Sequence, residues 1–289
     1  YSNDSTLIGI RAGRVPTPLG LYNDTRDVAS TRPGIFLPQS IYFDVNRNLA
    51  ISADGGYLYG EHRTDYGDFF LNIGIIEPRG NDSAFEHVFT GPSSGEMAGE
   101  TSWVGRLNYE WQGGRVRLAA TYGDFNMDLN PKGSPLLPGS WRFNPLIFSA
   151  QYNAENWSLT GEYAIRRTRF NGFSFPPNAD TTGESYYIQG TYKIFAYLEA
   201  MLRYDVLYWN RDDKSGNGFA EKYAAFGVSD HSQFAKDFTV GLRLEVFPSM
   251  LVSAEYHRVN GTGWLASLEN PKNTTQYWDL FSLMVSYDF

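Results

Sequence analysis

The clearest fold signal in this chain is the segment FTVGLRLEV, residues 238–246. Phe238, Leu242 and the other apolar residues occupy every second position, and Thr239 and Arg243 belong to the positions between them. Successive side chains of a β-strand point to opposite faces, whereas a helix needs apolar residues three and four positions apart. The stretch therefore predicts a strand with one apolar face and one polar face.

Segments of about ten residues with the same alternation recur along the whole chain. They are residues 6–15, 49–60, 68–77, 102–111, 115–124, 143–152, 157–167, 185–194, 198–208, 237–247, 251–259 and 278–289. Strands of soluble proteins average about five or six residues, but a tilted strand that crosses a membrane needs about nine to eleven. A soluble sandwich, in which the apolar faces pack on a second sheet, is the alternative that this length disfavours.

The connectors between these segments alternate in length. The short ones are residues 61–67, 112–114, 153–156, 195–197 and 248–250, and the long ones are 16–48, 78–101, 125–142, 168–184, 209–236 and 260–277. Short turns on one side and long loops on the other are typical of a bacterial outer-membrane barrel. Residues 1–289 are therefore predicted to form one all-β domain, a transmembrane antiparallel up-and-down β-barrel of about 12 strands. If the N-terminus is truncated, as the turn-like residues 1–5 suggest, the whole barrel would have 14–16 strands.

Composition excludes several other classes of protein. Hydrophobic residues make up 42%, charged residues 19% and aromatic residues 16% of the 289 positions, and the net charge is −8. A helical membrane protein needs runs of about 20 apolar residues, and a disordered chain has few aromatics. No basic patch offsets the acidic total, so a nucleic-acid partner is not expected. The absence of cysteine excludes disulfides, thiol catalysis and cysteine-ligated metals.

The alternation also assigns each side chain to lipid or to the interior. An arginine facing lipid at mid-membrane costs about 2–4 kcal/mol, and 18 of the 24 basic residues are arginine, so inward arginines are nearly forced. The predicted pore-lining residues are Arg11, Arg106, Arg117, Arg166, Arg203, Arg243, Glu162, Glu199, Asp205 and Glu245. A cluster of guanidinium groups holds a fixed positive field across a narrow pore. The alternative is that each arginine pairs with a carboxylate and only braces the wall.

The connector of residues 16–48 is long for an ordered loop. Its apolar stretch GIFLP, residues 34–38, is unfavourable in open water. We therefore expect the loop to fold into the lumen and narrow it, adding Arg26, Asp27 and Arg32 to the constriction. The alternatives are that it packs on a neighbouring subunit or caps the mouth of the barrel.

Catalytic and cofactor motifs are weak in this sequence. Adjacent His231 and Ser232 lie in a long connector, but a hydrolase also needs an orienting partner and an oxyanion site. No phosphate-binding glycine loop, HExxH or calcium-loop pattern is present in the sequence. We therefore predict no enzymatic activity, no metal and no cofactor, and keep an outer-membrane hydrolase as a minor alternative.

Two segments carry a resemblance to known proteins. The last ten residues, 280–289, alternate in apolar character through Phe281 and Leu283 and end in Phe289, and so resemble the C-terminal signature of Gram-negative outer-membrane proteins. Residues 13–22 resemble a motif of the phosphate-selective porins and their relatives, although Leu19 stands where that motif usually has Phe. The resemblance implies location in the bacterial outer membrane, contact with its lipid and lipopolysaccharide, and a homotrimer. The family's phosphate selectivity is not carried over.

These features together predict an outer-membrane porin. The channel would pass small hydrophilic solutes by passive diffusion, with a preference for anions set by the lumen arginines. A plugged structural or adhesive barrel with functional outer loops is the alternative.

Overall fold

The computed structural model describes residues 1–44, 47–80, 95–132, 136–173, 178–265 and 274–287. Twelve antiparallel strands form one sheet in which each strand pairs with its neighbour in sequence. They are β1 (Thr6–Pro16), β2 (Ser52–Thr64), β3 (Gly67–Pro78), β4 (Glu96–Trp111), β5 (Val116–Asn130), β6 (Gly139–Asn153), β7 (Trp157–Asn171), β8 (Asn178–Phe195), β9 (Leu198–Tyr208), β10 (Phe234–Phe247), β11 (Met250–Asn260) and β12 (Tyr277–Tyr287). The predicted all-β, twelve-strand meander is confirmed.

Strand boundaries differ from the prediction mainly at the ends next to long connectors. β4 begins at Glu96 rather than 102, and β8 begins at Asn178 rather than 185. Backbone pairing continues there past the apolar segment that the alternation detects. β2 instead begins late, at Ser52, because residues Arg47–Ile51 form the short helix α1. The C-terminal Phe289 of the predicted signature lies outside the described residues.

One face of the sheet is apolar and exposed. Leu242 of β10 is 50% exposed and Leu283 of β12 is 65% exposed, and both belong to the phase predicted to face lipid. Trp103 and Leu107 on β4 are exposed in the same phase. Large exposed apolar patches are rare on soluble monomers, so this face requires a lipid environment. No helix in the described part of the chain is long and apolar enough to span a bilayer.

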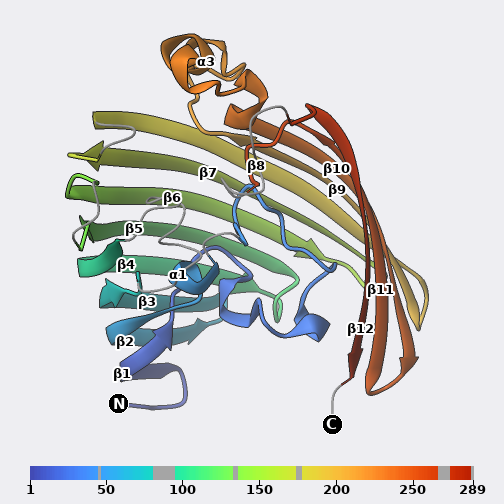
Figure 1. The fold of residues 1–289 in the computed structure, drawn as a ribbon. Coiled ribbons are helices and arrows are strands. Elements are labelled where there is room, and N and C mark those ends of the chain that lie inside the picture. The colour runs from blue at the N-terminus through green and yellow to red at the C-terminus, as the bar shows by residue number, and fades with distance from the viewer. Residues whose placement is uncertain (45–46, 81–94, 133–135, 174–177, 266–273, 288–289) are drawn as a thin grey trace.

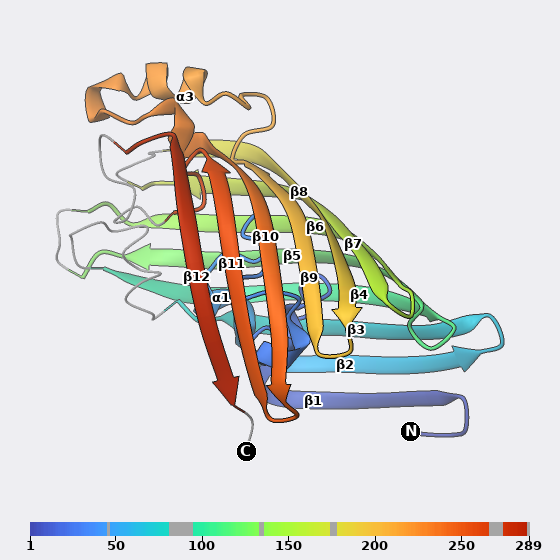
Figure 2. The same cartoon turned by 90° about the vertical axis from the view of Figure 1, so that its right-hand side faces the viewer.

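The sheet curves strongly, with β1 and β12 as its two edges among the described strands (Figures 1 and 2). At the β1 edge, residues 1–5 turn back so that Tyr1 and Ile8 exchange backbone hydrogen bonds of 3.0 and 2.8 Å. Unpaired strand edges are not tolerated in hydrocarbon, because their N–H and C=O groups find no partner there. Both edges therefore need a pairing partner in the membrane.

The connector between β1 and β2 lies on the concave side of the sheet (Figure 1). It contains the 3-10 helices η1 (Asn23–Thr25) and η2 (Ala29–Thr31). The connector between β9 and β10 contains α3 (Asn217–Lys222), η3 (Ala224–Phe226) and η4 (Asp230–Gln233) and lies beyond the strand ends. The long connectors thus differ in where they pack.

The concave face is not uniformly polar, although the pore-lining residues predicted from the sequence are all charged. Met97, Val104, Met127 and Trp141 belong to a buried apolar cluster formed by strands β1 to β6. Towards the end of β5 the alternation is kept but its two faces are reversed, because Met127 faces inward between the polar outward residues Asn126 and Asp128. Alternation alone therefore did not reveal this cluster.

Candidate functional site: the concave face and its loop

The strand register places the predicted inward residues on one face. Asn72, Arg106 and Thr121 are neighbours across β3, β4 and β5, and Gln189 and Arg203 are neighbours across β8 and β9. Side chains directly opposite in an antiparallel pair share a face. The phase opposite to the exposed apolar residues contains Arg11, Arg106, Arg117, Arg166, Arg203, Arg243, Glu162, Glu199, Asp205 and Glu245.

Glu162 on β7 is the main contact point between this face and the loop of residues 17–44. Its carboxyl oxygens accept hydrogen bonds from the Leu21 backbone N–H (3.0 Å) and the Tyr42 hydroxyl (2.6 Å) of the loop. They also accept bonds from the Ser149 hydroxyl (2.5 Å) and the Tyr187 hydroxyl (2.8 Å) of the wall. Four donors directed at one carboxyl group fit its ionised form, which only accepts.

Two further wall carboxyl groups accept hydrogen bonds from loop backbone. Glu255 on β11 receives the N–H groups of Ile35 (2.8 Å) and Phe36 (3.1 Å), and Asp205 on β9 receives that of Ser40 (3.2 Å). The stretch 34–38 therefore lies against the wall, where its apolar side chains leave water. Bonds to charged acceptors are about twice as strong as neutral ones.

Four wall arginines donate to loop carbonyl oxygens. Arg106 reaches Gly20 O (2.9 Å) and also pairs with Asp24, and Arg203 reaches Phe36 O (2.9 Å). Two further contacts are Arg166 to Ser40 O (3.2 Å) and Arg243 to Arg32 O (3.1 Å). Residues Arg106, Arg166 and Arg203 are only 6%, 4% and 2% exposed. These guanidinium groups thus hold the loop.

The remaining predicted wall residues do not contact the loop through any hydrogen bond or ion pair in the described part of the chain. Arg11 is exposed and lies over the Tyr59 ring at 4.3 Å, a cation–π contact. Arg117 pairs with Glu110 (2.9 Å). Glu199 is half-buried and Glu245 is exposed. For Arg117 the structure thus favours the bracing alternative.

The loop carries its own charged residues. Arg26 is buried and pairs with Asp44 at 3.0 Å. Burial lowers the pKa of the Arg26 guanidinium, and Asp44 opposes that effect. Asp27 pairs with Arg47, and Arg32 donates to the Met284 sulfur at 3.6 Å. Burial also raises the pKa of the Tyr42 phenol well above its usual range, and Glu162 adds to that effect.

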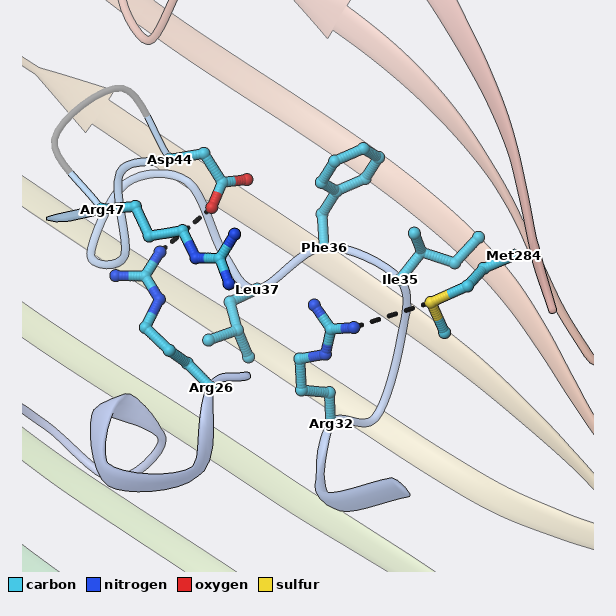
Figure 3. A pocket seen from close by; sticks show the side chains of 8 residues that line it. All are labelled: Arg26, Arg32, Ile35, Phe36, Leu37, Asp44, Arg47 and Met284. Atoms are coloured by element: carbon cyan, nitrogen blue, oxygen red, sulfur yellow. Dashed lines mark hydrogen bonds and ion pairs between the residues drawn. The ribbon is translucent and has the colours of Figure 1, made fainter. Parts of the chain in front are cut away.

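A cavity of about 310 Å³ lies between the loop and β12. Its lining residues are Arg26, Arg32, Ile35, Phe36, Leu37, Asp44, Arg47 and Met284 (Figure 3). Three guanidinium groups and one carboxylate therefore face this cavity. Sequence reasoning missed Arg47, although it lies inside the predicted connector 16–48, because a loop residue carries no periodic signal.

A buried cluster on β10 and β11 was also missed. His257 contacts Asp237 Oδ2 through Nδ1 (2.8 Å) and Glu255 Oε2 through Nε2 (3.2 Å). All three side chains are buried beside Phe36 of the loop, whose ring lies 5.9 Å from that of His257. The inward phase of alternation places His257 and Glu255 on this face, so that signal was present in the sequence. Through His257, the Glu255 carboxylate that holds the loop is connected to Asp237 on the neighbouring strand β10.

The residues of the enzyme alternative do not form a catalytic pair. The Ser232 hydroxyl donates to Ser229 O (2.6 Å), and the His231 ring contacts Asp230 (3.3 Å) and the Thr274 hydroxyl (2.9 Å). A serine nucleophile needs its base within hydrogen-bond reach. The geometry gives Ser232 no such base among the described residues.

Comparison with known proteins supports the fold. The chain is similar to the outer-membrane channel DcaP of Acinetobacter baumannii (TM-score 0.55, 11% identity, 97% of this chain and 71% of that one). It is also similar to OmpT of Vibrio cholerae (0.57, 11%, 99% and 78%) and to an anion-selective porin from Comamonas acidovorans (0.50, 13%, 87% and 63%). No protein-family model and no curated protein sequence matches it.

The chain therefore has the fold of Gram-negative outer-membrane channels. The exposed apolar face and the alternation of short and long connectors agree with that fold, and together they assign the chain to the outer membrane. The resemblance to phosphate-selective porins in residues 13–22 and the homotrimer stay predictions.

Proposed function

We propose that this protein is a channel for passive diffusion of small hydrophilic solutes and that it prefers anions. The observation that carries the proposal is the cavity between loop and wall, which three arginines and one carboxylate line. Arg26 and Arg47 pair with Asp44 and Asp27, so among the described residues Arg32 supplies the positive charge of this cavity that has no carboxylate partner. Fixed positive charge in a narrow site attracts anions and repels cations.

The preference is assigned to loop arginines rather than to the wall arginines predicted first. Arg106, Arg166 and Arg203 are buried and donate to loop carbonyl oxygens, so their charge is directed at the loop. Arg32 has no carboxylate partner among the described residues, and it faces the cavity (Figure 3). The loop is thus the constriction, and the wall positions it.

Reversal potentials across planar bilayers test this proposal. With a salt gradient, the unaltered channel should show anion preference, and Arg32→Gln should reduce it by removing a charge whose side chain donates only to a sulfur atom among the described residues. Arg115→Gln is the control. Arg115 does not line the cavity; it lies in the short turn between β4 and β5, where it donates to the Gln112 side chain. A cation preference in the unaltered channel would refute the proposal.

The plugged barrel remains the second candidate because the loop is hydrogen-bonded to wall residues of β4, β7, β9, β10 and β11. A plug of this kind would block ion flow. Absence of conductance in the unaltered chain, together with conductance after loop release, would favour the plug over the channel.

A further inference from the structure

The outward side chains of β7 change from apolar to charged along the strand. From Trp157 through Leu159 and Tyr163 the outward side chains are apolar and exposed, and the next outward positions after Ile165 are Arg167 and Arg169. From Trp157 to Arg167 the strand advances roughly 33 Å at about 3.3 Å per residue, which at the 35–45° tilt of such barrels is roughly 25 Å of height, the height of their apolar belt. The arginines thus lie where lipid headgroups begin, at the end that carries the long connectors.

Two arginines face each other at this level. Arg142 on β6 is the direct cross-strand partner of Arg169 on β7. Both belong to the outward phase, because Trp141 and Phe170, which are also partners, pack in the apolar cluster of the concave face. Like charges placed directly opposite are destabilising. An anion that bridges the two guanidinium groups would offset this repulsion.

The surrounding acidic residues neutralise the pair only in part. Asp180 lies opposite Arg169, but its two oxygens accept from Arg167 at 2.8 and 2.5 Å. Asp128 is diagonal to Arg142 and forms no ion pair with it among the described residues. Within that part of the chain, Arg142 has no hydrogen-bond or ion-pair partner.

Arg169 is also incompletely satisfied. Its Nη2 donates to Asn144 Oδ1 at 2.9 Å, whereas its buried Nε has no hydrogen-bond partner among the described residues. The planar guanidinium presents several donors suited to phosphate oxygens. Arg169 therefore retains donor capacity for a ligand beside Arg142.

We propose that Arg142 and Arg169 bind the phosphate group of an anionic lipid in the membrane leaflet on the long-connector side. The exposed apolar residues below them, Phe148 and Tyr163, would contact the acyl chains of the same molecule. A lipid would contact both the arginine pair and the apolar residues, whereas free phosphate would contact only the arginine pair. This inference concerns the outer face and is independent of solute passage.

Thermal stability of the folded protein in nonionic micelles tests the proposal. Short-chain phosphatidic acid should raise the stability in a concentration-dependent way, because a ligand that binds only the folded state stabilises it. In Arg142→Gln/Arg169→Gln, we expect its apparent affinity to fall by roughly tenfold to thirtyfold. Without lipid, the same variant should be more stable than the unaltered chain, because the like-charge contact is removed.

The matched control is Arg258→Gln/Asp279→Asn, which removes an exposed ion pair from the same outward rim on β11 and β12. Its affinity for phosphatidic acid should be unchanged, and short-chain phosphatidylcholine should bind all variants equally. An equal loss in the control, or an unchanged affinity in the arginine variant, would overturn the assignment. Equal stabilisation by inorganic phosphate would overturn the lipid and leave a free-anion site.

Discussion

Replacing Glu162 by Gln should release the loop from the concave wall. The Glu162 carboxyl accepts two hydrogen bonds from the loop, from Leu21 N and the Tyr42 hydroxyl. Hydrogen bonds to charged groups contribute about 1.5–3 kcal/mol each. We take the lower value, about 1.5 kcal/mol, for each of the two bonds, because the amide oxygen of the glutamine side chain still accepts one of them. The variant then loses about 3 kcal/mol of the free energy that attaches the loop to the wall. That corresponds to a released population roughly 100-fold larger.

Limited proteolysis with chymotrypsin measures this population. The bonds Phe36–Leu37 and Tyr42–Phe43 lie in the loop, and Leu37, Tyr42 and Phe43 are buried against the wall. When opening is fast relative to cleavage, the cleavage rate follows the open population. Cleavage of these bonds should therefore become roughly 100-fold faster in Glu162→Gln, while the barrel keeps its folded electrophoretic mobility.

Glu199→Gln is the matched control for this experiment. Glu199 belongs to the same inward face and is half-buried, but it makes no hydrogen bond to the loop among the described residues. Its replacement should leave the cleavage rate within about twofold, as for a surface change of less than 0.5 kcal/mol. Equal cleavage rates in the two variants and the unaltered chain would refute the assignment of Glu162 as the anchor.

Other substitutions and pH test the same arrangement. Gly34→Ala should accelerate chymotrypsin cleavage as Glu255→Gln does, because a Cβ on Gly34 would overlap the Glu255 carboxyl group that holds Ile35; cleavage slower than in the unaltered chain would contradict this. In bilayers, Arg32→Gln should reduce anion preference more than Arg203→Gln does, because the Arg203 guanidinium donates to Phe36 O. A larger effect of Arg203→Gln would show that wall arginines set the selectivity. Burial raises the pKa of Tyr22 to about 12, above the usual value of about 10. The neutral Tyr22 phenol therefore stabilises the fold fully below pH 10, and this stabilisation is lost between pH 10 and 12. In a titration followed by phenolate absorbance, Tyr22→Phe should lack one late-titrating group of the unaltered chain, and the loss of an early-titrating group would contradict the prediction.

The sequence predicted the sheet well because its signal is local. Period-two alternation along 238–246 and its counterparts follows from the geometry of a strand with lipid on one side. The orientation of Arg106 and Arg203 followed from the same rule, and the register agrees with it. The start of β2 shows the limit, because residues 49–51 were predicted as strand and belong instead to the helix Arg47–Ile51.

The partners of the inward residues were not predictable in this way. Gly20, Phe36 and Ser40 contact the wall through backbone atoms, and backbone atoms leave no mark on side-chain patterns. The contact between Glu162 and Tyr42 spans 120 positions and depends on the path of the loop. The apolar cluster around Met127 was missed because this part of β5 lies beyond residue 124, where the strand was predicted to end. Met127 faces inward there between the polar outward residues Asn126 and Asp128, so the alternation persists with its two faces reversed.

The mixture of acidic and basic groups on the concave face has a physical reason in the loop itself. A chain without regular secondary structure offers both unpaired N–H and unpaired C=O groups, and buried ones must find partners. Carboxylates such as Glu162 and Glu255 accept from the N–H groups, and guanidinium groups such as Arg106 and Arg203 donate to the carbonyls. A wall of one sign would satisfy only half of these groups. An inward face that alternates in sign is therefore what an irregular loop requires, and any selectivity must come from the charges that the loop turns away from the wall.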